Sequence, residues 1–242
     1  MNSLAFIRCL LLVLTVGLFQ TALADFEISR EKQTAIEQVD ALEQEIANMS
    51  MELWNYSEIA LREVKSAEFL AGILEKEGFQ LERGVADMPT AFVAEWGEGG
   101  PVIGILAEYD ALPDIGNEPV PKRQPRTDGH AHGQGCGHNL FGAGSVGAAI
   151  ALKRSMETHG IKGTVKLFGT PAEETVVGKV YMAKANVFNG IDVTLDWHPF
   201  YTTEVTNARG QALNNFQVEF FGQAAHGALD PWNGRSALDA VE

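Results

Sequence analysis

Cysteine is scarce in this 242-residue sequence, which contains only Cys9 and Cys136. Cys9 lies in an N-terminal segment that we expect to be removed, so Cys136 would be left without an intramolecular disulfide partner. This scarcity excludes a fold held together by a framework of disulfides. Because an unpaired thiol is a liability in an oxidising compartment, we expect either burial or ligation to protect Cys136.

Basic residues are also scarce, with 18 Lys and Arg against 32 Asp and Glu, and the formal net charge is -14 at pH 7. A chain of this charge repels polyanions, so nucleic-acid binding is excluded as its expected role. Low-complexity runs are few and internal repeats are lacking, while 45% of the residues are hydrophobic. This composition is typical of a globular protein with a buried core.

The first 24 residues have the features of a secretory signal peptide. Arg8 is the only early charge, an apolar run covers 9–19, and an A-L-A cleavage motif stands at 22–24. An uncleaved membrane anchor is the alternative, but a span needs about 20 apolar residues and this run is shorter. We therefore expect a secreted or periplasmic protein that begins near Asp25, with no membrane attachment after cleavage.

The first part of the expected mature chain combines helices with short strands. Apolar residues recur every three or four positions between 36 and 49, which predicts an amphipathic helix. A second helix carries the apolar residues of 69–74 and is expected to end at Gly78, a favourable residue for a helix C-terminus. Three β segments follow it, at 79–83, 90–96 and 101–110.

The middle of the chain alternates helix and strand more regularly. Helices are expected at 140–156 and 178–185, and strands at 163–169 and 191–197. This order predicts an α/β fold with a mixed, mainly parallel sheet flanked by helices. After a domain boundary near Gly210, the segment 214–222 alternates like a half-exposed strand, and the sequence ends within an expected helix.

Four polar clusters follow an apolar β segment or precede a helix. Ligands of such sheets gather at the carboxyl ends of the strands, so we expect these clusters to lie close together in space. Thiolate and imidazole groups suit zinc, and a carboxylate also admits manganese. The clusters are Glu108 with Asp110, Cys136 with His138, Glu173 with Glu174, and His198.

The surroundings of Cys136 favour a role as a metal ligand. Gly135 and Gly137 allow the backbone to bend tightly around an ion, and the start of the following helix would favour the thiolate. If Glu174 also binds metal, the adjacent Glu173 is free to act as a general base. The expected ligand set is Cys136, His138, Glu174 and His198.

Taken singly, each cluster has a simpler interpretation. A lone cysteine or histidine more often packs or faces solvent, and adjacent glutamates are common in the first turn of a helix. The pair Glu108 and Asp110 is also typical of a capped turn. Only the joint arrangement favours a metal site. The other central histidines, His130, His132 and His159, are interpreted as loop or helix-end residues.

Five motifs occur in one order along the chain: LAEYDALP, GCGHNLFGAGSVGAAIALK, GTPAEE, DWHP and FFGQAAHGALDPWNGRSALDAVE. Together they resemble the co-catalytic metallopeptidase superfamily of aminoacylases and carboxypeptidases. Within it, the chain is most similar to the amidohydrolase branch that includes the aminobenzoyl-glutamate hydrolases. The resemblance runs from about residue 36 to residue 242.

The resemblance implies two bound divalent metal ions, zinc or manganese, with Glu173 as the catalytic base. It implies that Asp110 orients a metal ligand and that His226 stabilises the oxyanion of the reaction, across a dimer in several relatives. Residues 25–210 would then be the N-terminal part of the catalytic domain, and 211–242 the beginning of a lid and dimerisation domain. The ligands implied are Cys136, His138, Glu174 and His198.

The function implied is metal-dependent hydrolysis, through metal-bound hydroxide, of the amide bond in N-acyl amino acids, aminobenzoyl-glutamate-like compounds or dipeptides. The expected partners are that small substrate and a second copy of the chain. One alternative is a dipeptidase for a basic C-terminal residue. Another is a truncated, non-catalytic chain that binds metal or a partner protein, because the family's final histidine ligand is not in the sequence. The family also has a histidine where this chain has Gln134.

Overall fold

The computed structural model describes residues 28–205, 210–214 and 216–242. The chain divides into two units, Met1–Phe200 and Tyr201–Glu242. The predicted signal peptide and Cys9 lie outside the described residues, and the domain boundary near Gly210 stays a prediction. None of the helices in the described ranges has the length and apolar character needed to cross a bilayer.

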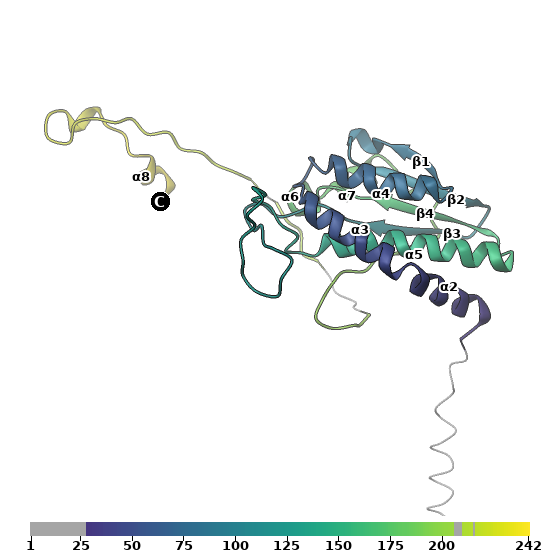
Figure 1. Ribbon diagram of the computed structural model, residues 1–242. Helices are drawn as coiled ribbons and strands as arrows, with labels where there is room; N and C mark the ends of the chain where they lie inside the picture. Colours follow the sequence, from purple (N-terminus) through teal and green to yellow (C-terminus); the bar gives the residue numbers. More distant parts are fainter. Residues whose placement is uncertain (1–27, 206–209, 215) are drawn as a thin grey trace, which may run out of the picture. The chain divides into compact units, whose positions relative to one another are not determined.

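The first unit is built on a five-stranded sheet of order β1-β2-β4-β3-β5 (Figure 1). The pairings of β3 with β4 and β5 are parallel, whereas those of β2 with β1 and β4 are antiparallel. The mixed sheet flanked by helices, expected from the sequence, is confirmed. The strands are β1 (Gln80–Arg83), β2 (Phe92–Glu98), β3 (Val102–Ala107), β4 (Gly163–Gly169) and β5 (Val193–Leu195).

Helices cover one face of this sheet in two layers (Figure 1). Helices α4 and α5 pack on the strands, and α2 and α3 pack against α5. The apolar residues of 36–49 form two helices rather than one, because the helix breaks at the buried Leu42. The four helices are α2 (Arg30–Ala41), α3 (Glu43–Tyr56), α4 (Val64–Lys76) and α5 (His138–His159).

The opposite face is covered by the short helices η1 (Val85–Asp87) and α7 (Gly178–Lys184). Side chains alternate between the faces along each strand, so neighbouring residues enter different cores. In β4, Leu167 packs with the core beneath α4 and α5, and Phe168 packs with Met182 of α7. Both faces of the central strand are therefore buried, which fixes its register against its neighbours.

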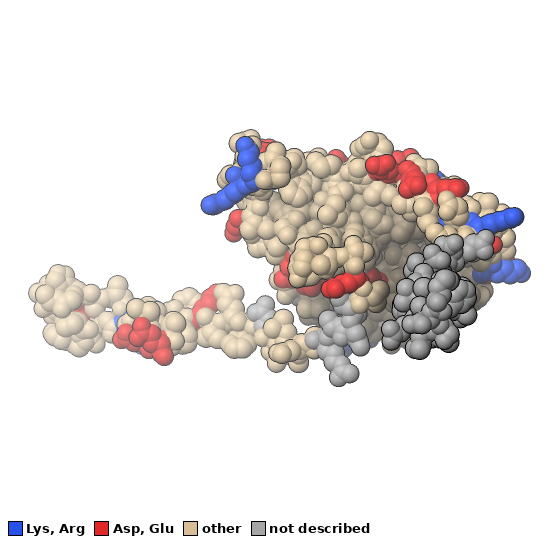
Figure 2. Space-filling view, turned by 90° about the horizontal axis from the view of Figure 1, so that it is seen from below, with Lys and Arg blue, Asp and Glu red and all other residues tan. Residues whose placement is uncertain are grey.

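The surface carries the acidic excess of the sequence. On the face of the larger unit shown in Figure 2, acidic side chains occur near the middle, whereas the visible basic side chains lie toward the margins. The basic groups on this face are therefore spread apart rather than gathered in a single patch.

The second unit has little regular structure. It contains the short helices η2 (Pro231–Asn233) and α8 (Ala237–Val241), and an isolated bridge joins Gln223 to Arg235. The prediction of a strand at 214–222 is wrong for the described residues of that segment. A strand is stabilised by pairing with neighbours, and within the described residues of this segment no strand partner is present.

Candidate metal centre

Four segments meet at the carboxyl ends of the parallel strands. They are the turn after β3, the loop that leads into α5, the turn after β4 and the segment after β5. The sequence predicted this meeting, because the carboxyl ends of parallel strands lie at one edge of a sheet. The side chains on these segments form two overlapping clusters that share His138.

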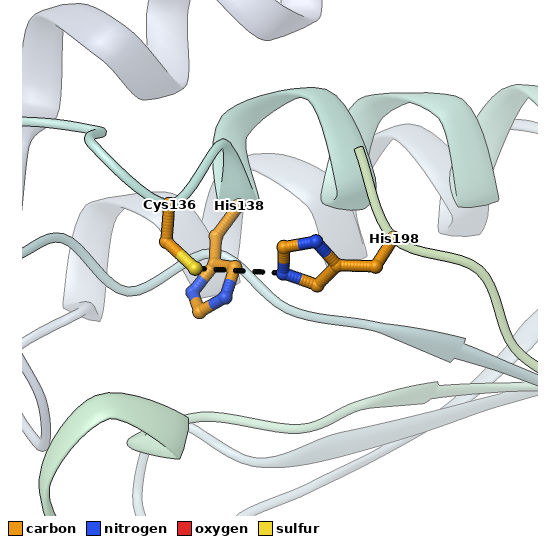
Figure 3. Close-up of side chains that lie close together, drawn as sticks. All are labelled: Cys136, His138 and His198. Atoms are coloured by element: carbon orange, nitrogen blue, oxygen red, sulfur yellow. Dashed lines mark hydrogen bonds between the residues drawn. The ribbon is translucent and has the colours of Figure 1, made fainter. Parts of the chain in front are cut away.

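The first cluster joins Cys136, His138 and His198, whose ligand atoms all lie within 4.8 Å of one another (Figure 3). Cys136 Sγ is 3.5 Å from His198 Nε2, and the two imidazole rings are nearly perpendicular with centroids 5.5 Å apart. Figure 3 shows the three side chains pointing toward one another, Cys136 and His138 from the start of α5 and His198 from a second segment. A sulfur and two imidazole nitrogens are a suitable donor set for a borderline-soft divalent ion.

Both histidines direct their Nε2 atoms into this cluster. His198 Nδ1 is 2.9 Å from the carbonyl oxygen of Pro199, which can only accept, so Nδ1 carries the proton. His138 Nδ1 likewise donates to Asp110, at 2.9 Å from Oδ1 and 3.1 Å from the carbonyl oxygen. Hydrogen bonds of this kind fix the tautomer and orientation of metal-binding histidines.

The loop before α5 is shaped by glycine and by Gln134. Gly137 has a φ of 86°, in the left-handed region that favours glycine, and a Cβ there would lie 3.2 Å from the Pro199 side chain. The buried Gln134 donates to the carbonyl oxygen of Tyr109 at 3.4 Å and accepts from the Asn139 N–H at 3.1 Å. Gln134 thus ties this loop to the turn after β3.

The second cluster joins His138 to two carboxylates, Glu108 and Glu173. His138 Nε2 lies 2.9 Å from Glu108 Oε2 and 3.9 Å from Glu173 Oε2. Burial acts to lower the pKa of His138, but hydrogen bonds to Asp110 and Glu108 raise it to about 10. The acidic groups on both sides of the ring therefore favour the protonated form of His138 when no cation is bound.

Glu173 and Glu174 open the short helix α6 (Glu173–Val176), which follows β4. Burial, and then the charge of Glu108, raise the pKa of Glu173 above its ordinary value. The Glu174 N–H donates to Asp110 Oδ2 at 2.9 Å, so Asp110 contacts both His138 and the glutamate turn. The two adjacent glutamates thus have different environments. The side chain of Glu173 is half-exposed, whereas Glu174 is anchored through its backbone N–H.

Burial and acidic neighbours together disfavour the thiolate of Cys136. Burial, followed by interactions with Glu174 and the charges of Glu173 and Glu108, raises the pKa of the Cys136 thiol to about 12. The expectation that the start of the helix would favour the thiolate is thus wrong for the metal-free protein, because burial and the neighbouring carboxylates outweigh the helix end. A bound cation would offset this negative charge and favour the thiolate.

The residues present fit a metal ion. Within the described part of the chain, Glu174 Oε1 is a buried side-chain atom of this site that has no hydrogen-bond partner, and when His138 carries a proton only on Nδ1, its Nε2 and the facing Glu108 Oε2 also lack one. Buried polar atoms are normally paired, and each orphaned atom calls for an explanation such as an ion. All three are lone-pair donors of the kind that metals bind, once His138 has lost its second proton.

Two residues of the site were not in the ligand or catalytic set expected from the sequence. Glu108 was recognised only as part of an acidic pair after a strand, and nothing singled out Lys179 of α7. In the structure Lys179 Nζ forms an ion pair with Glu108 Oε1, which leaves Oε2 to face His138. Although burial opposes it, contacts with His138 and Lys179 lower the pKa of Glu108.

The other histidines lie in different settings. The N–H of His130 donates to Asp128, and His132 Nδ1 accepts from the Asp114 N–H at 3.3 Å. His159 is exposed and contacts Thr34. His226 belongs to the second unit, where its ring accepts from the N–H groups of 228 and 229. Its implied role with the oxyanion stays a prediction.

Comparison with known proteins agrees with this geometry. The family model described as Peptidase family M20/M25/M40 matches residues 104–228, which is more than half of the chain and includes all seven predicted site residues. The chain belongs to peptidase family M20/M25/M40.

Several known proteins are similar to this chain. One of the subunits of the p-aminobenzoyl-glutamate hydrolase of Escherichia coli (strain K12) is 40% identical over 203 residues, covering 84% of this chain and 42% of that protein. The Xaa-Arg dipeptidase of Mus musculus is 32% identical over 232 residues, covering 89% of this chain and 48% of that protein. The chain thus spans about half the length of these relatives.

A solved structure supports the same assignment. A Bacillus subtilis protein, described as a dinuclear metal-binding peptidase of the M20 family, aligns with a TM-score of 0.54 and 29% identity. The alignment covers 64% of this chain and 42% of that protein. Membership of the M20 family and the unpaired donor atoms together point to bound metal ions.

Proposed function

We propose that this chain carries the metal-binding half of a metal-dependent amidohydrolase with two divalent ions, zinc or manganese. The observation that carries the proposal is the convergence of three ligand side chains from two segments, beside buried donor atoms that lack partners. A dinuclear relative in the M20 family supports the number of ions. The proposed ligands are Cys136, His138, Glu174 and His198, and Glu108 Oε2 faces the same space.

The proposed substrates are N-acyl amino acids, aminobenzoyl-glutamate-like compounds or dipeptides, which share one amide bond beside a carboxylate. Bound divalent ions would polarise the amide carbonyl and lower the pKa of water. Glu173 takes one proton from the attacking water and delivers it to the nitrogen of the breaking C–N bond, so that an amine leaves. The raised pKa of Glu173 suits this role, because it makes the carboxylate a stronger base.

Metal content and hydrolysis test this proposal together. The purified chain is expected to bind Zn²⁺ or Mn²⁺ and to hydrolyse either p-aminobenzoyl-glutamate or a dipeptide ending in arginine, and the preferred substrate separates the two activities. Glu173→Gln is expected to lower turnover by about 10²–10⁴-fold with metal content unchanged. Glu157→Gln, on the exposed side of α5, is the matched control. Hydrolysis that survives Glu173→Gln would contradict the mechanism, and metal binding without any hydrolysis would support a non-catalytic chain.

We also propose that the second unit pairs with another copy and presents His226 to the oxyanion. The AAHG motif in the sequence supports this idea through its resemblance to family members. Light scattering of the protein is expected to give the mass of a dimer, and His226→Ala is expected to lower turnover without releasing metal. If the protein is a monomer and His226→Ala retains full activity, this part of the proposal is overturned.

The protein is further proposed to be secreted or periplasmic. The support is the signal-peptide pattern of residues 1–24. N-terminal sequencing of the protein from its native host is expected to begin near Asp25. A chain that retains Met1 and stays in the cytoplasm would contradict this localisation.

A further inference from the structure

A buried glutamate outside the metal cluster contacts the turn that carries the proposed base. Glu63, directly before α4, has 0% relative exposure. Its Oε1 accepts the N–H of Ala172 at 2.8 Å, and its Oε2 accepts the Thr90 hydroxyl at 3.1 Å. Burial raises the pKa of this carboxyl group. Burying a carboxyl group costs free energy, so the buried position of Glu63 calls for an explanation.

The backbone at Ala172 is the reason this contact matters. Ala172 is fully buried and has φ 60° and ψ 38°, in the left-handed region that residues with a Cβ rarely adopt. It directly precedes Glu173. The hydrogen bond from its N–H to Glu63 satisfies a donor that water does not reach and holds this strained conformation in place.

A second carboxylate acts on the same turn from the other side. Asp110 Oδ2 accepts the N–H of Glu174, so the residues on both sides of Glu173 are anchored by acidic side chains. Tyr109, next to Asp110, donates its hydroxyl hydrogen to the carbonyl oxygen of Thr90 at 2.5 Å. The contacts through Thr90 therefore link Glu63 to the turn after β3 as well.

We propose that Glu63 is a positioning residue that fixes the 172–174 turn, so that Glu173 faces His138 and Glu174 directs its carboxylate into the metal centre. The inference rests on the proposed function for what those two glutamates do. The placement of the turn itself rests only on the hydrogen bonds. Glu63 touches neither the proposed ions nor the substrate, and it acts through the backbone of Ala172.

A purely stabilising role is the competing explanation, and Glu58 provides its matched control. Glu58 also accepts backbone N–H groups, those of Lys65 and Ser66, at 3.1 and 2.8 Å. Those bonds hold the start of α4 and do not reach the glutamate turn. Loss of Glu58 is therefore expected to lower stability without changing the metal centre.

Metal affinity and amide exchange separate the two explanations. In a Zn²⁺ titration against a chromophoric chelator, Glu63→Ala is expected to weaken binding by about 10–100-fold, the usual effect of losing a group that orients ligands. In metal-free protein the same variant is expected to show faster amide exchange at 172–174. Glu58→Ala is expected to lower the melting temperature but to leave both readouts within about twofold of wild type.

Glu63→Gln is the conservative variant that keeps the proposal testable if Glu63→Ala folds poorly. The amide oxygen of glutamine accepts the Ala172 N–H, and the Thr90 hydroxyl accepts from the amide nitrogen. Affinity and exchange are thus expected to return to near wild type. Unchanged exchange at 172–174 in folded Glu63→Ala would overturn the inference. If wild type binds no Zn²⁺, the proposed function fails, and amide exchange alone decides the role of Glu63.

Discussion

The carboxylate of Asp110 and the imidazole of His138 form a fully buried pair, with Oδ1 and Nδ1 2.9 Å apart. Because Nδ1 donates to Asp110, the opposite nitrogen faces the metal cluster. The second oxygen of Asp110 accepts the Glu174 N–H. The carboxylate of Asp110 therefore orients two of the four proposed ligands. It contacts the imidazole ring of His138 and the backbone N–H of Glu174.

Asp110→Asn tests this double contact. An asparagine cannot accept hydrogen bonds at both positions, so either His138 or the Glu174 turn loses its partner. We expect metal affinity to fall by about 10–100-fold. Asp192→Asn is the matched control, since Asp192 accepts the N–H of Val102 at an exposed position. Equal metal affinity in wild type and Asp110→Asn, measured by chelator competition, would refute the orienting role.

The stability of the metal-free protein is expected to depend on pH through His138. Its pKa in the fold is about 10, above the ordinary value of 6.5, so the protonated form stabilises the native state. This contribution is fully present below about pH 6.5 and is lost as the pH rises through about 10. Urea unfolding in the presence of a chelator, from pH 6 to pH 10, measures it.

The comparison that isolates this effect uses two histidine variants. His138→Gln is expected to remove the fall in stability relative to wild type, whereas His159→Gln, at an exposed helix end, is expected to retain it. A His138→Gln protein with the same pH dependence as wild type would mean that other groups cause the fall.

The ion pair between Lys179 and Glu108 is expected to be energetically coupled. Glu108 is buried and Lys179 is partly covered, with side-chain exposures of 7% and 24%. A double-mutant cycle with Glu108→Gln and Lys179→Met should give a coupling energy of about 1–3 kcal/mol. The control pair, Lys166 with Glu95 at 2.7 Å, is more exposed and should give less than about 1 kcal/mol. Similar coupling energies in the two pairs would show that burial does not strengthen the interaction of Lys179 with Glu108.

Close packing of α5 against the turn after β3 makes Gly142 sensitive to substitution. A Cβ at Gly142 would lie 2.7 Å from the carbonyl oxygen of Glu108, so backbone must move. We expect Gly142→Ala to destabilise the protein by about 1–3 kcal/mol. Gly72→Ala, in α4 with open space around it, should gain up to about 1 kcal/mol from helix propensity. Thermal unfolding checks both, and a neutral Gly142→Ala would contradict the packing.

The sequence predicted the framework well, because periodicity and glycines mark helices and strands. The expected strand at 163–169 is β4 with the same ends. The expected helix at 140–156 lies within α5. By contrast, the strand expected at 214–222 is wrong, since alternation alone does not supply a partner strand.

The site was predictable only as a set of residue types, not as a network. Cys136, His138 and His198 stand in recognisable motifs, and the structure brings them together. The contact of Lys179 with Glu108 joins residues 71 positions apart, and that of Ala172 with Glu63 joins residues 109 positions apart. Such contacts depend on how helices pack on the sheet, which no local pattern in the sequence records.

The central claim is that distant segments of this chain hold divalent ions between sulfur, imidazole and carboxylate groups. Anomalous diffraction from crystals of the Zn²⁺-loaded protein, recorded on both sides of the zinc absorption edge, measures this directly. The account predicts zinc peaks in contact with Cys136, His138, Glu174 and His198. Zinc peaks at other residues, with these four side chains free of metal, would contradict it.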